Sequence, residues 1–179
     1  MLGPDEYHDA YPGREAPGLD NNAYTNVITA WLMCRALETI DALPEHLGKE
    51  LRDELRVTEE ELNRWEDLSR RIFVPFHDGI ISQFEGYEDL EELDWKSYRN
   101  RYGDIGRLDR ILEAEGDTPN RYRLSKQADL LMLFYLLSPG ELTELFGRLG
   151  YPFDPERDVT RNDEYYLART SDGSTLSVH

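Results

Sequence analysis

Cysteine and histidine are both scarce in this sequence of 179 residues. The single cysteine, Cys34, permits no internal disulfide, and we interpret it as a core thiol of a cytoplasmic protein because it lies in an apolar helical pattern. The four histidines, His8, His46, His77 and His179, are too widely scattered to suggest a metal site. We therefore expect neither a disulfide nor a bound metal.

Basic residues and long apolar runs are also scarce. Lys and Arg number 20 against 37 Asp and Glu, which gives a net charge of -17 and argues against binding to nucleic acid. The acids are spread along the chain, as on a solvated surface. No run of 18 apolar residues occurs and the N-terminus lacks a signal-peptide pattern, so we expect no membrane association.

The length is sufficient for one domain with a sizeable core, and helical periodicity dominates the chain. Capping boxes are expected at Thr58 with Glu61 and at Ser138 with Glu141. The predicted helices span about Ala23 to Leu43, a short segment around Leu47 to Leu55, a segment after Thr58 as far as Ile72, Ile105 to Glu115, Lys126 to Leu137, Ser138 to about Leu149, and Arg161 to Thr170.

The remaining segments are predicted as loops with short β elements. Residues 9–20 contain two prolines and two glycines without an apolar period, which indicates a loop. Short β-like runs on both sides of Asp78-Gly79 predict a hairpin. Lys126 to Leu137 is the most apolar segment and is hydrophobic almost all round, so we expect an interior helix there.

The N-terminal segment Gly3–His8 carries two adjacent acids, Asp5 and Glu6, after a Gly-Pro bend. A carboxylic acid held in a loop against aromatic rings has a raised pKa and is suited to general-acid cleavage of a glycoside. The alternative is a pair of solvated acids, which is the commoner fate of such a pattern. The residues of this loop alone leave both interpretations open.

Several ordered blocks together resemble glycoside hydrolase family 65, which contains the maltose, trehalose and kojibiose phosphorylases. The blocks are Gly3–His8 followed by Asn21–Asn26, then Ile81–Tyr87, Ser125–Asp129, Gly150–Pro155 and Tyr165–Ser171. The resemblance implies a mainly α fold, part of an (α/α)6 barrel with short β segments in its loops. It also implies that residues 1–179 are the second half of that catalytic barrel. On this interpretation the chain is a fragment without the family's N-terminal β-sandwich, first half-barrel and C-terminal β domain.

By resemblance, Glu6 is the general acid and Asp5 has a structural role. Phosphate attacks the anomeric carbon from the opposite face, so that an α-linked glucose disaccharide gives β-glucose 1-phosphate with inversion. The resemblance assigns the phosphate site to Ser171, Gly173 and Ser174. Composition alone favours a flexible Ser/Gly-rich tail at this point.

One position departs from the family pattern. Asp172 stands where characterised phosphorylases mostly carry His, and an acid there would repel phosphate unless a cation compensates. Asp172 could instead activate water, which would make the enzyme an inverting α-glucoside hydrolase. A third alternative is a catalytically inactive truncated fragment, because half a barrel leaves apolar helix faces without partners.

The resemblance also assigns the substrate site. Lys126 and Gln127 would hydrogen-bond the donor glucose, with Asp129 pairing with Lys126, although on sequence alone the pair is equally a helix terminus facing water. His8 and Tyr7 would line the acceptor side of the cleft. Inorganic phosphate is the co-substrate and no cofactor is implied. Family phosphorylases often form homodimers, and the disaccharide linkage cannot be determined from the residues.

Overall fold

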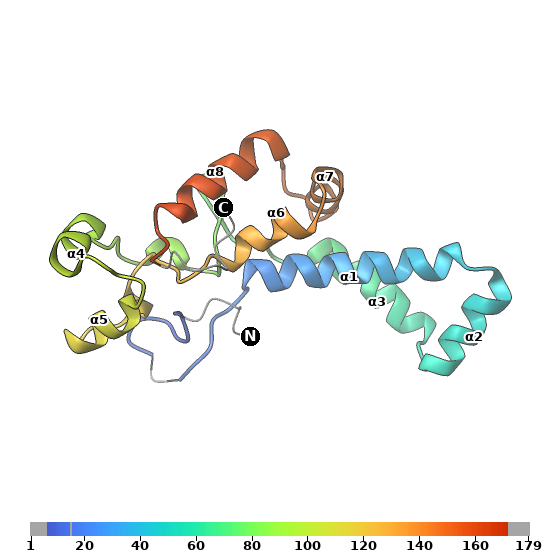
Figure 1. Cartoon of the computed structure of the whole chain (residues 1–179). Coiled ribbons are helices and arrows are strands. Elements are labelled where there is room, and N and C mark those ends of the chain that lie inside the picture. The colour runs from blue at the N-terminus through green and yellow to red at the C-terminus, as the bar shows by residue number, and fades with distance from the viewer. Residues whose placement is uncertain (1–6, 15, 172–179) are drawn as a thin grey trace.

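The computed structural model describes residues 7–14 and 16–171, and the described chain is mainly helical (Figure 1). In order, the elements are α1 (Ala23–Ala42), α2 (Glu45–Leu55), α3 (Glu59–Arg71), β1 (Phe76–His77), β2 (Ile80–Ile81), the 3₁₀ helix η1 (Tyr87–Asp89), α4 (Trp95–Tyr102), α5 (Leu108–Ala114), the 3₁₀ helices η2 (Pro119–Arg121) and η3 (Asp129–Leu131), α6 (Met132–Leu136), α7 (Pro139–Arg148) and α8 (Pro155–Leu167).

Helices α1, α2 and α3 form an arm that extends from the rest of the molecule, with α3 folding back along α1 (Figure 1). The inner half of α1 buries Ala23, Val27, Ala30 and Cys34, which share one face because they recur every three or four residues. The predicted bounds of α1 are confirmed to within one residue. The predicted capping box at Thr58 is present in α3, which confirms that local signal.

The body of the molecule places α6 and α7 beside the inner end of α1, and α8 packs against α7 and β2 (Figure 1). Its core is rich in stacked rings: Phe146 of α7 lies 4.5 Å from Phe153, centroid to centroid, and Phe76 of β1 lies 5.1 Å from Tyr151. The capping box predicted at Ser138 starts α7, and Gly150, at a φ of 83°, follows its end. The predicted helix over this segment is confirmed.

The predicted run from Lys126 to Leu137 is wrong as a single interior helix. Ser125 is held in a bridge to Thr170, and the chain turns through Lys126 and Gln127 before η3 and α6 begin. One face of α6 is open, since Met132 is 38%, Tyr135 is 77% and Leu136 is 50% exposed. The tertiary contact at Ser125 therefore overrides the helical tendency of the apolar run.

Other helices also differ from the prediction, and α5 begins at Leu108 rather than at Ile105. The last helix begins at Pro155, six residues before the predicted Arg161, because Asp154-Pro155 places a proline in its first turn. Helix α4 was not predicted. It starts at Asp94, whose carboxylate accepts a hydrogen bond from the Ser97 N–H at 3.0 Å. Its aromatic residues Trp95, Tyr98 and Tyr102 recur at helical spacing, a local signal that was overlooked.

Within the described ranges, no single helix is both long and apolar enough to cross a membrane. The segments Asp129–Leu136 and Pro139–Arg148 reach the required length and composition only as a pair, and they are bent by 115° relative to each other.

The predicted hairpin is confirmed: β1 and β2 pair antiparallel through Phe76 with Ile81 and His77 with Ile80. Its turn has Asp78 at a φ of 46° and Gly79 at 75°. The Arg161 side chain of α8 donates to the Asp78 carbonyl, and a Cβ at position 79 would lie 2.7 Å from Arg161 Nη1. Gly79 is thus required by the positive φ of the turn, and a Cβ there would displace the Arg161 guanidinium packed over it.

We expect Gly79→Ala to lower the free energy of unfolding by about 1–3 kcal/mol, because the variant combines a strained backbone with a displaced arginine. Gly147→Ala is the matched control, because Gly147 lies in α7 with open space at its Cβ position. The free energy of unfolding of this control is expected to rise by about 0.5–1 kcal/mol. Urea denaturation of both variants measures the difference, and equal values would contradict this account of the turn.

Candidate active site

A short backbone bridge holds the Thr170–Ser171 segment against Ser125. The Ser125 N–H donates to the Arg169 carbonyl at 2.9 Å, and the Ser171 N–H donates to the Ser125 carbonyl at 3.1 Å. The Thr170 hydroxyl donates to the Tyr166 carbonyl at 2.8 Å, so the Ser125 hydroxyl, 3.1 Å away, donates to it. The bridge fixes the residue before Lys126 next to the first residue of the predicted phosphate loop.

Tyr7 joins the N-terminal segment to this bridge. Its hydroxyl lies 2.7 Å from the Ser171 hydroxyl in a buried hydrogen bond. The Tyr7 ring is anchored in a small core cluster with Leu93, Leu108, Leu112 and Leu124. The residue that follows Glu6 in the sequence therefore contacts the residue that begins the predicted phosphate loop.

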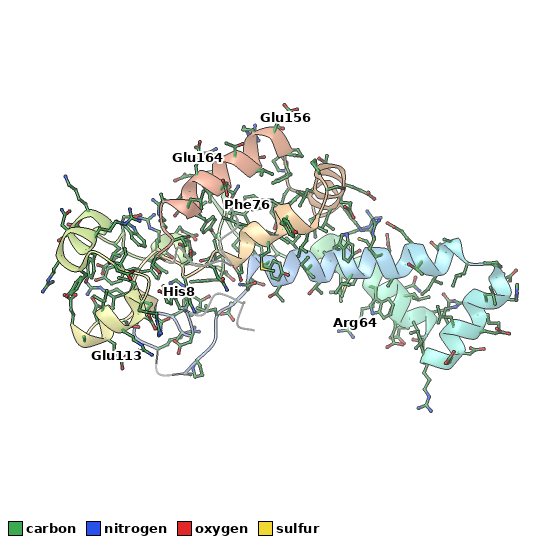
Figure 2. All side chains as sticks on the ribbon, in the orientation of Figure 1. His8, Arg64, Phe76, Glu113, Glu156 and Glu164 are labelled. Carbon is green, nitrogen blue, oxygen red and sulfur yellow. The ribbon has the colours of Figure 1, made fainter. Side chains whose placement is uncertain are left out.

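His8 is buried rather than exposed to a cleft. It is 3% exposed, its Nε2 lies 3.0 Å from the Tyr122 carbonyl, and its ring packs edge-on against Phe84 and Tyr87. Figure 2 shows His8 in the body, far from Arg64 on the arm. These contacts assign His8 a structural role, and its contact with an acceptor sugar stays a prediction. The place of Tyr7 on the acceptor side likewise stays a prediction.

A buried carboxylate, Asp129, connects three of the blocks. It accepts from Asn22 Nδ2 at 3.0 Å and from Gln83 Nε2 at 3.3 Å. Asn22 Oδ1 accepts a hydrogen bond from the Thr25 N–H and so caps α1. The Gln83 carbonyl accepts from the Ala23 N–H. Asp129 thereby fixes the start of η3 to the start of α1 and to the chain leaving β2.

Tyr166 secures the same region from α8. Its buried hydroxyl donates to the Ile81 carbonyl at 2.6 Å, and its carbonyl receives the Arg169 N–H at 2.9 Å. Burial raises the pKa of the Tyr166 hydroxyl well above its usual value, so the group remains a neutral donor. Tyr166 therefore links the hairpin to the turn that leads into Ser171.

Lys126 and Gln127 lie in the loop between the Ser125 bridge and Asp129, and both are half-buried. The loop is held at both ends, which fixes its backbone where it leaves the contact between Ser125 and Ser171. Their contact with glucose, and the pairing of Lys126 with Asp129, stay predictions. Glu6, Gly173 and Ser174, together with Asp5 and Asp172, lie outside the described residues.

Sequence reasoning missed the supporting residues Ser125, Asn22 and Gln83. Each belongs to a block quoted for the resemblance, but none carries an obvious chemical role. Asn22 precedes a helix and would be taken as an N-cap, which accounts for only one of its two side-chain atoms. Its second hydrogen bond reaches Asp129, a partner 107 residues away that no local pattern indicates.

The arrangement is suited to polar substrate chemistry. Among the described residues, no three His, Cys, Asp or Glu side chains gather in a way that could hold a metal ion. The structure brings together the ends of three segments that contain a carboxylic acid, a Lys-Gln pair and a hydroxyl-rich loop. Such groups can donate a proton, bind sugar hydroxyls and bind an anion, respectively.

Comparison with known proteins gives one family. The description "Glycosyl hydrolase family 65 central catalytic domain" matches residues 1–179. An uncharacterized glycosyl hydrolase of Mycobacterium tuberculosis is 60% identical over 178 residues, covering 99% of this chain and 13% of that protein. The trehalose 6-phosphate phosphorylase of Lactococcus lactis is 40% identical, covering 99% of this chain and 22% of the relative.

A kojibiose phosphorylase of Thermoanaerobacter brockii is 31% identical over 98% of this chain and 20% of its own length. Among solved structures, a chain assigned as a kojibiose phosphorylase from the human microbiome matches with a TM-score of 0.66 and 22% identity, over 99% of this chain and 21% of that one. This chain thus spans about a fifth or less of the length of these relatives. The chain belongs to glycosyl hydrolase family 65, within the family's central catalytic domain.

Proposed function

We propose that this chain supplies the general acid, part of the donor-glucose site and the phosphate loop of an inverting α-glucoside phosphorylase. The observation that carries the proposal is the meeting of Tyr7, Ser125 and Ser171, which brings the three segments assigned to these tasks to one place. Relatives named as phosphorylases of trehalose 6-phosphate, kojibiose and 1,2-α-glucosylglycerol support the same reaction class.

In the proposed reaction, a phosphate oxygen forms a bond to the anomeric carbon while the bond to the leaving oxygen breaks. Glu6 gives its proton to the leaving oxygen, and the products are β-glucose 1-phosphate and the free acceptor. Lys126 and Gln127 hydrogen-bond the donor glucose. Ser171, Gly173 and Ser174 donate to the phosphate, which enters already anionic and needs no base.

The proposed setting is the second half of an (α/α)6 barrel, with the remaining elements supplied by a longer polypeptide. The open face of α6 fits this setting, because Tyr135 and Leu136 would then pack against a further helix. The helical content and the structural likeness to a longer family member agree with it. On this proposal, the bound sugar would lie between the segments described here and elements outside this chain.

Asp172 favours a second candidate function, inverting hydrolysis, because a carboxylate in the phosphate loop could accept a proton from an attacking water. Proton NMR of the product formed by the natural polypeptide that carries this sequence separates the two. Phosphate-dependent release of β-glucose 1-phosphate from one of a panel of α-linked glucose disaccharides is expected. Free glucose made at the same rate without phosphate would instead establish the hydrolase.

Lys126→Met tests the donor site in the same assay. We expect the KM for the disaccharide to rise about tenfold or more, since a charge-assisted hydrogen bond to the sugar contributes about 1.5–3 kcal/mol. Lys49→Met is the matched control, because Lys49 is exposed on α2 in the arm. An unchanged KM in the Lys126 variant would remove Lys126 from the sugar site.

A further inference from the structure

Thr170 and Ser171 have few protons left for a ligand. The Thr170 N–H faces the Leu167 carbonyl at 3.5 Å, and its hydroxyl donates to the Tyr166 carbonyl. The Ser171 N–H donates to the Ser125 carbonyl. Of the described donors in these two residues, only the Ser171 hydroxyl remains for an incoming anion.

A serine hydroxyl has one proton and two lone pairs, so it can donate only one hydrogen bond at a time. If Ser171 donated to Tyr7, no proton would remain for phosphate. When phosphate is bound, therefore, the Tyr7 hydroxyl must donate to Ser171 Oγ across the 2.7 Å contact. A donated hydrogen bond also polarises the acceptor hydroxyl and makes it a stronger donor to the anion.

The anchoring of the Tyr7 ring among Leu93, Leu108 and Leu124 gives this hydroxyl a fixed position. Resting on the proposed phosphorolysis, we propose that Tyr7 is a positioning residue that directs the Ser171 hydroxyl proton toward phosphate and ties the acid segment to the phosphate loop. Its ligand class is an oxyanion, inorganic phosphate in the forward reaction, and it acts through Ser171 without touching the sugar.

The test is Tyr7→Phe in the natural polypeptide that carries this sequence, with the KM for phosphate and the KM for disaccharide measured separately. Losing one oriented hydrogen bond is expected to raise the KM for phosphate about three- to tenfold, with the KM for disaccharide unchanged. Tyr11→Phe is the control, since the Tyr11 hydroxyl bonds only the Glu85 carbonyl and the Asp20 N–H among its described contacts. It should leave both constants unchanged.

A double-mutant cycle separates positioning from a general loss of structure. In a Ser171→Ala background, Tyr7→Phe should no longer change the KM for phosphate, because the hydroxyl that it orients is gone. Calorimetric titration with inorganic phosphate gives the same comparison without turnover, and far-UV circular dichroism verifies folding. The proposal would be overturned if Tyr7→Phe and the wild type had the same KM for phosphate. It would also be overturned if Tyr7→Phe raised this KM equally in the wild-type and Ser171→Ala backgrounds.

Failure of the proposed function gives a different result from failure of this inference. If the chain belongs to a hydrolase, the wild-type polypeptide itself shows neither phosphate-dependent turnover nor phosphate binding. If phosphorolysis holds but Tyr7 has no positioning role, the wild type depends on phosphate and Tyr7→Phe matches it.

Discussion

Replacing Glu6 by Gln is expected to slow disaccharide turnover by about 100- to 10,000-fold, the usual contribution of a positioned general acid. Gln has nearly the same size and polarity but no proton to release to the leaving oxygen. Disaccharide binding, measured by calorimetry, should therefore stay close to that of the wild type. The assay uses the natural polypeptide that carries this sequence, with phosphate present.

α-Glucosyl fluoride sharpens this test, because fluoride leaves without being protonated. Glu6→Gln should turn it over at nearly the wild-type rate, which would show that the defect lies in proton transfer alone. Glu85→Gln is the control: Glu85 is an exposed acid that accepts from Asn21 Nδ2 at 2.7 Å, and no catalytic task is assigned to it. Near-wild-type turnover of the disaccharide by Glu6→Gln would exclude Glu6 as the acid.

Removing the Asp129 carboxylate is expected to lower the free energy of unfolding by about 2–5 kcal/mol, since each buried polar group left unpaired costs about 1–3 kcal/mol. In Asp129→Ala, the amides of Asn22 and Gln83 would both lose their hydrogen bond to this carboxylate, in an interior where Asp129 is 1% exposed. This cost is a large share of a typical domain's stability, about 5–15 kcal/mol. Urea denaturation measures the change.

Exchanging the acid and the amide between positions 129 and 83 tests whether the hydrogen-bond pattern causes the loss of stability. Asp129→Asn alone turns an amide donor toward a second donor, whereas Asp129→Asn combined with Gln83→Glu restores a donor facing an acceptor. The combined variant should therefore recover much of the lost stability. Asp67→Asn is the surface control, because its ion pair with Arg71 is exposed and contributes about 0–1 kcal/mol. A similarly small loss in Asp129→Ala would contradict the assignment.

Local signals predicted most of the helices. The capping boxes at Thr58 and Ser138 act within one turn of backbone, so they can be identified without knowledge of the fold, and both are present. The hairpin at Asp78-Gly79 is equally local and was also predicted correctly. The start of α8 and the whole of α4 were missed, although Asp154-Pro155 and the helical spacing of Trp95, Tyr98 and Tyr102 are recognisable local signals.

The support of the candidate site could not be predicted in this way. The bridge between Ser125 and Thr170 depends on a contact 45 residues apart, and it breaks the helix that the apolar run from Lys126 would otherwise favour. The hydrogen bonds of Asp129 with Asn22 and Gln83 likewise join distant parts of the chain, while its expected pairing with Lys126 stays a prediction. The blocks of the resemblance named the segments, but only the fold shows how they meet.

The hydrogen bond between Tyr7 and Ser171 joins residues 164 positions apart, whereas the arm forms from consecutive helices. Closing so long a loop costs entropy before the contact stabilises anything, and distant contacts slow folding. During synthesis, Tyr7 leaves the ribosome long before its partner exists. The arm can therefore fold while the chain is still growing, whereas Tyr7 can meet Ser171 only after Ser171 has emerged.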